Sequence, residues 1–290
     1  MFTYTRLMSL SATVLLLGLV ACDEATAPTT TAVLTNAQAD SVALVTTVDA
    51  AEVIEAGAIS MSTGLALSPP VAGPTLSCEP VVTPFPPVNS DEDMVPDSVR
   101  FEYTDCTFTR GMMTHTLNGA IDIIDPTPTL TDFDIRTVFT AFTRTLTNSA
   151  TDQTMSAMFD GSRQLAATVD TLGVTMTNFL TAFTYPNDAT ASHLKNWVAK
   201  FTADVPGSIA LGEPLPAGML TVTGNSTWTR LSQSWAMTTT TPTPLHFNPA
   251  CTVAPRFDDG TLIHTVTRLE ATATFEVEFT ACGQYTVTRL

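Results

Sequence analysis

The clearest pattern in the chain is a strict alternation of apolar and polar residues between positions 271 and 281. Ala, Phe and Val occupy the odd positions there, and Thr and Glu occupy the even ones. A period of two places one set on a covered face and the other in solvent, which indicates an antiparallel strand with one buried face. Shorter alternations have the same form: Val99-Phe101-Tyr103, Leu165-Ala167-Val169 and Trp197-Ala199-Phe201.

From Ser98 to the end of the chain we count about eight to eleven such segments, separated by short turns. Many short strands in succession favour a meander, in which each strand pairs with the next. We therefore predict a mainly β fold: an antiparallel meander sheet over residues 98–290, curved or barrel-like, with one N-terminal helix packed on it.

The helix is expected within residues 35–65, where the pattern changes. Thr35 and Asn36 can cap a helix over residues 37–56, and Gly57 is placed to end it. An apolar stripe at helical spacing lies between these limits: Leu44, Val48, Ala51 and Ile54. Residues 66–97 are rich in Pro and Asp, with seven prolines between positions 66 and 88, and they predict an extended loop.

The first residues carry a targeting signal. Arg6 precedes a short apolar run ending in Leu19-Val20-Ala21-Cys22, and the run is too short to span a bilayer. This tetrapeptide resembles the lipobox of bacterial lipoproteins. The resemblance implies cleavage after residue 21 and acylation of Cys22. The composition of the segment that follows, rich in Thr, Ala and Pro, predicts a flexible tether over residues 22–34. We expect an exported, lipid-anchored protein of the cell envelope, most simply at the outer membrane and facing the periplasm or the surface.

Composition narrows the set of partners. Charged residues make up only 14% of the chain, the formal net charge is −16, and Lys195 and Lys200 are the two lysines. Such a field repels phosphate backbones, so nucleic acid is excluded as a partner. The abundant threonine suits the solvent face of strands, because Thr is both β-branched and polar.

Four cysteines remain beside the lipidation site, and an even number in an oxidising compartment predicts two disulfides. Three pairings of Cys78, Cys106, Cys251 and Cys282 are possible. We favour Cys78–Cys106 and Cys251–Cys282, because each pair brackets a loop that feeds a strand. A zinc site is disfavoured, since its ligands normally come as close pairs.

An acidic stretch over residues 89–97 resembles the calcium loops of thrombospondin type 3 repeats. The resemblance implies a calcium site with four side-chain ligands: Asn89, Asp91, Asp93 and Asp97. Met94 departs from the pattern, because a glycine is expected at that turn. The alternative is a solvated acidic loop that precedes a strand.

Catalytic signatures are lacking in the sequence, so we do not expect an enzyme. A second acidic group, formed by Asp122, Asp125, Asp132 and Asp134, is typical of exposed turns. The four histidines are scattered outside any zinc motif, and Gly-x-Ser-x-Gly and phosphate-binding loops are missing. Trp197, Trp228 and Trp235 could line a ligand groove, but packing within the sheet is the simpler interpretation.

The pentapeptide Thr-x-Thr-Arg-Leu occurs at 227–231, 265–269 and 286–290. One interpretation is a repeated unit with its arginines aligned on one face. The other, which we favour because the spacings are unequal, is chance convergence of Thr-rich strands.

Three functions remain open. The leading hypothesis is a non-enzymatic, membrane-anchored module that binds an apolar ligand or an envelope component within the curved sheet. The second is a structural or surface-interaction protein braced by disulfides and calcium. The third is a hydrolase with a divergent site.

Overall fold

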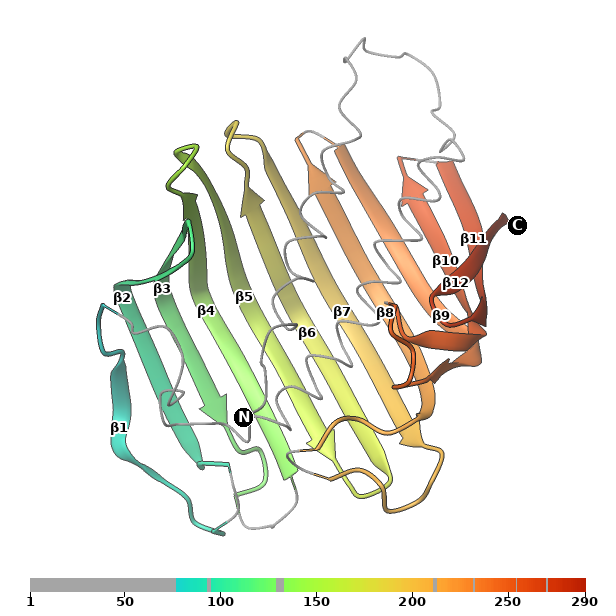
Figure 1. Ribbon diagram of the computed structural model, residues 1–290, viewed down its shortest axis with the longest axis horizontal. Coiled ribbons are helices and arrows are strands. Elements are labelled where there is room, and N and C mark those ends of the chain that lie inside the picture. Colours follow the sequence, from blue (N-terminus) through green and yellow to red (C-terminus); the bar gives the residue numbers. More distant parts are fainter. Residues whose placement is uncertain are drawn as a thin grey trace.

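The computed structural model describes residues 77–92, 95–128, 133–210, 213–231, 233–253, 255–269 and 271–290. These residues form one open antiparallel sheet in which spatial order follows chain order from β1 to β12 (Figure 1). The strands are β1 Val81–Val88, β2 Ser98–Arg110, β3 Met113–Ile124, β4 Phe133–Asn148, β5 Gln153–Ala167, β6 Thr171–Thr184, β7 Thr190–Ala203, β8 Gly218–Arg230, β9 Gln233–Phe247, β10 Phe257–Arg268, β11 Ala271–Ala281 and β12 Gln284–Arg289.

This architecture confirms the mainly β meander, and eleven strands begin at or after Ser98. The described residues contain no helix. The expected helix at 37–56, the signal peptide and the tether all lie outside the described residues. Within the part of the chain that the structure describes, no helix has both the length and the apolar character needed to cross a bilayer.

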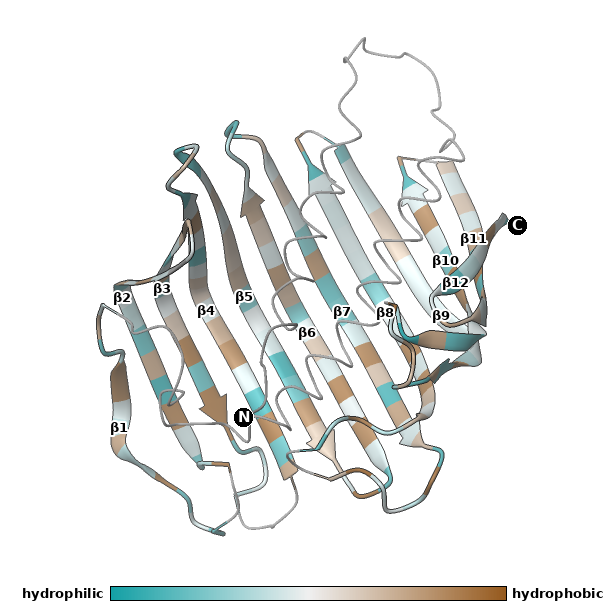
Figure 2. Cartoon of the chain, viewed as in Figure 1, coloured by the Kyte–Doolittle hydropathy of each residue, from teal (hydrophilic) through white to brown (hydrophobic). Residues whose placement is uncertain are grey.

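One face of the sheet carries the buried apolar side chains, and we call it the core face. The alternation that produces this face is clearest in β7, where every second residue from Ala191 to Ala203 is buried. Figure 2 shows the same alternation as bands of hydrophobic and hydrophilic residues along the strands. The main core joins strands from both ends of the sheet, with Val99 in β2 and Phe279 in β11 among its members. Burying such rings and aliphatic side chains contributes roughly 1.5–3 kcal/mol each.

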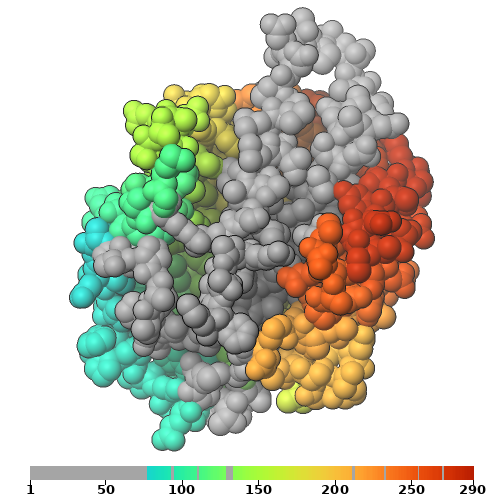
Figure 3. Space-filling model, in the orientation of Figure 1, coloured from blue at the N-terminus to red at the C-terminus, as the bar shows by residue number. Residues whose placement is uncertain are grey.

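The long β7–β8 connection covers the core face at the end of the sheet where β7 finishes. Ile209 and Leu215 are buried in the main core, and the Ile209 N–H donates to the Val169 carbonyl at 3.0 Å. The Gly207 N–H donates to Asp170 Oδ1 at 2.6 Å. This connection therefore closes one end of the core face. In the space-filling view, the coloured residues run from blue-green on the left to red on the right (Figure 3).

Two expectations for local structure are wrong. Residues 81–88 form an edge strand rather than loop, because an edge strand needs ladder bonds on one side only and so tolerates Pro84, Pro86 and Pro87. Val169, which extended an alternating pattern from Leu165, lies in the β5–β6 turn and is 61% exposed.

Bulges interrupt the ladder near the middle of several strands. Register shifts lie between Tyr103 and Cys106, between Phe139 and Phe142, and between Met176 and Phe179. Each shift inserts an extra residue, so two residues three positions apart face the same side of the sheet.

The bulge beside Gly161 shows how the sequence specifies this irregularity. Asn178 has φ 46° in β6, and its N–H donates to Asn196 Oδ1 at 2.8 Å. Gly161 has φ 105°, and a Cβ there would collide with the Asn178 carbonyl oxygen. Gly119 faces the Ala141 bulge of β4 in the same way. A glycine inside these strands therefore marks close backbone approach.

Candidate functional site

Five rings gather on the core face where the bulges cross β2, β4, β5 and β6. Phe139 lies 5.6 Å from Phe179 and 6.2 Å from Phe159 between ring centroids, and Tyr103 lies 5.6 Å from Phe142. All five rings are half-buried, and burial raises the pKa of Tyr103. We call Tyr103, Phe139, Phe142, Phe159 and Phe179 the aromatic cluster.

Sequence patterning missed this cluster because Phe139 and Phe142 break the period of two. The bulge between them brings both rings to the core face. The detectable signal was Asp160-Gly161 inside the neighbouring strand, since a glycine within a strand often marks a bulge.

A second group of rings continues across the core face toward β9. Phe183 of β6 lies 6.2 Å from Trp228 of β8, and His193 of β7 contacts the same Trp228 at 5.2 Å. Burial, and then the nearby Lys195 charge, lower the pKa of His193 to about 3, so this imidazole is neutral at physiological pH. Trp197, in contrast, is a core residue and only 1% exposed.

The three copies of the repeated pentapeptide lie at the ends of β8, β10 and β12. These strands run in the same direction, and register places Arg230, Arg268 and Arg289 on the core face. Each guanidinium lies over a ring: Arg230 over Tyr185 at 5.8 Å, Arg268 over Trp235 at 5.3 Å and Arg289 over Phe275 at 5.9 Å. The three arginines share one face, but they are not level: Arg289 lies opposite Phe275, which pairs with His264, four residues before Arg268 in β10. We call these three residues the arginine row.

Charge is divided between the two faces of the sheet. Among the side chains that the structure describes, six cationic ones stand at core-face positions of the sheet register: Arg144, Arg163, Lys195, Arg230, Arg268 and Arg289. Within the described strands the carboxylates lie on the opposite, outer face, apart from Asp105 and Asp259 at bulges. The outer-face carboxylates are Glu102, Asp122, Asp134, Asp160, Asp258, Glu276 and Glu278.

Arg144 and His115 form a polar pair on the core face near the β2–β3 hairpin. The Arg144 Nη2 and His115 Nδ1 atoms are 2.9 Å apart, and Phe108 stacks on the imidazole at 4.4 Å. Because arginine only donates, His115 Nδ1 accepts this hydrogen bond. Burial lowers the pKa of Arg144, although a guanidinium remains charged at physiological pH.

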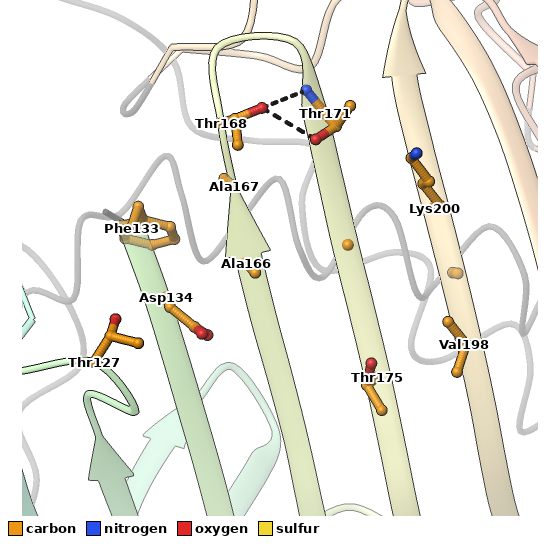
Figure 4. Close-up of a pocket in the computed structure, with 12 residues that line it drawn as sticks. Thr127, Phe133, Asp134, Ala166, Ala167, Thr168, Thr171, Thr175, Val198 and Lys200 are labelled. Atoms are coloured by element: carbon orange, nitrogen blue, oxygen red, sulfur yellow. Dashed lines mark hydrogen bonds between the residues drawn. The ribbon is translucent and has the colours of Figure 1, made fainter. Parts of the chain in front are cut away.

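A shallow hollow of about 390 Å³ lies on the outer face across β4 to β7 (Figure 4). It exists because Ala166 and Gly173 have little or no side chain, and Asp134 and Lys200 stand on opposite sides of it. Burial raises the pKa of Asp134, which accepts a hydrogen bond from Gln164 Nε2 at 2.8 Å. Three strand spacings, about 14 Å, separate the two charged strands, so Asp134 and Lys200 are poorly placed to act on one bond.

The acidic stretch at 89–97 folds back on itself. The Ser90 N–H donates to Asp97 Oδ1 at 2.7 Å, and Ser90 Oγ donates to Asp97 Oδ2 at 2.5 Å. These bonds lower the pKa of Asp97. Asn89 and Asp91 are described in the same loop, whereas Asp93 and Met94 lie outside the described residues. Calcium binding by this loop stays a prediction.

The other acidic group does not converge on one point. Asp122 pairs with Arg100 at 2.9 Å on the outer face, and Asp125 Oδ1 accepts from the Thr127 N–H at 2.7 Å beyond the end of β3. Asp134 is held by Gln164, and Asp132 lies outside the described residues.

The described cysteines form the favoured pairs. Cys78 is bonded to Cys106 of β2, and Cys251 in the β9–β10 connection is bonded to Cys282 in the β11–β12 turn. Asp258 lies near the second bridge, but both sulfurs there are consumed by their mutual bond and do not offer a thiolate to an ion. Cys22 lies outside the described residues.

Comparison of the chain with protein-family models, with curated proteins and with solved structures found no match.

Proposed function

We propose that this chain is a lipid-anchored, non-enzymatic binding protein of the cell envelope, and that the core face of its sheet receives an apolar ligand. The aromatic cluster carries the proposal. Large apolar surfaces that are only half-buried are favoured contact points for ligands, since rings provide contact area at low conformational cost.

Three further features support it. The sheet is open, so the described strands do not enclose the aromatic cluster on every side. The lipobox at residues 19–22 supplies an anchor, and two disulfides suit an oxidising compartment. The N-terminal helix expected over residues 37–56 belongs to the same proposal, as an element packed against the sheet.

Titration of the full chain with the uncharged fluorescent probe N-phenyl-1-naphthylamine tests this function. We expect saturable binding that Phe139→Ala and Phe159→Ala weaken by about tenfold, because each removes a ring from the aromatic cluster. Phe85→Ala is the matched control, since that ring is 81% exposed on the edge strand β1. Absence of saturable binding, or equal losses in cluster and control variants, would contradict the proposal.

A structural or surface-interaction role is the alternative, and the disulfides favour it. They tie the segment before β1 to β2, and the β9–β10 connection to the β11–β12 turn. Each bridge closes a loop of about thirty residues and stabilises the fold by roughly 3–4 kcal/mol. This role predicts a lower Tm with reductant or chelator and no apolar probe binding. An unchanged Tm under both treatments would remove its support.

A further inference from the structure

Three hairpins at one end of the sheet have loops of the same kind. The β2–β3, β8–β9 and β10–β11 hairpins each have a loop of two residues in the ladder register. Because β2, β8 and β10 run in the same direction, these loops lie at the same end of the sheet. Each loop carries a large apolar side chain that is exposed to solvent: Met112 at 63%, Leu231 at 71% and Leu269 at 90%. We call these three residues the apolar tips.

The two leucines occupy backbone positions that favour other residue types. Leu231 has φ 53° and Leu269 has φ 55°. Asn and Gly suit this left-handed region in two-residue hairpin loops, whereas a leucine is disfavoured there by its backbone and by the contact of its side chain with water. Two copies of the repeated pentapeptide, at 227–231 and 265–269, end on these leucines. The repeat therefore places a leucine twice where it does not help the fold, which indicates a role in contacts outside the fold.

The arrangement of the apolar tips suits lipid better than a protein partner. The β4–β5 and β6–β7 loops, which lie between the first tip and the other two, carry the exposed Asp152 and Asp188. A stable protein interface needs a contiguous, closely packed patch, whereas separate side chains on loops can each insert between lipids. Arg268, one residue before Leu269, lies over Trp235 at 5.3 Å. Arg and Trp side chains both favour the boundary between headgroups and acyl chains.

The acidic residues of the connections favour the same orientation. The connections at the end of the apolar tips contain Asp152, Asp188 and Glu270 in the sequence. The opposite end has more acidic residues in its connections, among them Asp204 and the acidic stretch at 89–97. Anionic headgroups repel such an end. The end with the apolar tips is therefore the one that can approach a bilayer.

We propose that the apolar tips dock on a lipid bilayer, with Leu231 and Leu269 inserted among the headgroups. Acylation of Cys22, which belongs to the proposed function, brings the chain to the membrane, and the tips then fix which end of the sheet faces it. The docking is independent of the ligand of the core face.

Photolabelling from the membrane tests the docking. The acylated full chain is reconstituted in phosphatidylcholine vesicles that contain a lipid with a diazirine on its acyl chain, and is then irradiated. We expect adducts in the peptides that carry Leu231 and Leu269. The double variant Leu231→Asn with Leu269→Asn should lower their yield by about tenfold, because it removes the apolar surface that the bilayer buries. Asn tolerates positive φ, so this variant should keep or raise the Tm, and unfolding would not account for the loss.

The matched control is Val169→Asn with Val205→Asn, because these exposed valines lie in connections at the opposite end of the sheet. It should leave the tip adducts unchanged. Tip adducts that persist in the leucine variant, or that fall equally in the control, would overturn the docking. A chain that floats with the vesicles and is labelled at Phe139 and Phe159 but not at the tips would overturn the docking and leave the proposed function intact. If the chain does not float with the vesicles, both the docking and the anchored function fail.

Discussion

His246 Nδ1 lies 2.6 Å from Asp258 Oδ1, and the same imidazole reaches Asp204 Oδ2 through Nε2 at 2.9 Å. Asp204 follows β7 and Asp258 belongs to β10, so one side chain near the end of β9 joins two separate parts of the fold. Hydrogen bonds to Asp204 and then to Asp258 raise the pKa of His246, against the effect of burial. Burial acts to raise the pKa of Asp258, but the hydrogen bonds from Asn248 and His246 outweigh it and lower that pKa.

This arrangement predicts stability that declines with rising pH near neutrality. The folded pKa of His246 exceeds its unfolded value of about 6.5, so its contribution is complete below that pH and is lost as pH rises through the folded pKa. The pair is partly exposed, and we expect an effect below about 1 kcal/mol. Urea unfolding of the full chain between pH 7 and 9, where the buried His193 and His264 are largely neutral in both the folded and the unfolded chain, should show this slope, and His246→Gln should flatten it. An identical slope in the variant would contradict the assignment to His246.

Gly161 provides a test of the bulges. Gly161→Ala should destabilise the fold by about 2–4 kcal/mol, because φ is 105° and the new Cβ would collide with the Asn178 carbonyl oxygen. Gly111→Ala is the control: Gly111 has φ 60° in the β2–β3 turn, with open space around its Cα. It should cost only about 1 kcal/mol, measured by urea unfolding. Equal losses at both positions would show that close backbone approach does not matter.

Sequence patterning located strands best where one face is buried and the ladder is regular. The alternation at 271–281 coincides with β11, because each residue on its core face packs and each partner on the outer face meets solvent. The disulfide pairing was also predicted correctly from the sequence, because each bridge joins two cysteines that follow one another along the chain.

Sequence patterning failed at the irregular positions of the sheet. An alternation with a period of two does not predict a bulge, so the sequence did not indicate that Phe139 and Phe142 lie on the same face. The prolines of β1 hid this strand from sequence patterning. Proline lacks the N–H group that a ladder needs, so it is tolerated only in a strand at the edge of a sheet, and the sequence does not indicate which strand lies at the edge. Predicting that the three arginines of the arginine row share one face requires the direction and pairing of their strands as well as the residue pattern, and only the sheet order provides these.

Acylation at Cys22 is a prediction of the lipobox. Intact-mass measurement of the protein extracted from native membranes should find a chain that begins at Cys22 and carries the additional mass of its acyl groups. Cys22→Ala should release the protein from the membrane fraction. Detection of residues 1–21 on the mature chain, with an unmodified sulfur, would contradict export by this route.

Calcium binding at the 89–97 loop is predicted by its resemblance to Asp-rich calcium loops. Isothermal titration of the full chain with calcium chloride should give saturable heat, which Asp91→Asn should reduce because one charged oxygen ligand is lost. Asp188→Asn, in the β6–β7 turn, is a control on an unrelated exposed loop. Titration without heat would leave the segment as a solvated acidic loop.

Photoaffinity labelling tests the central role of the core face most directly. The full chain is irradiated with an uncharged alkyl diazirine, and the labelled peptides are identified by mass spectrometry. We expect adducts in the peptides of β4, β5 and β6 that carry Phe139, Phe159 and Phe179, reduced when excess oleyl alcohol competes. Labelling restricted to the exposed edge strand β1, or unaffected by the competitor, would contradict ligand binding on this face.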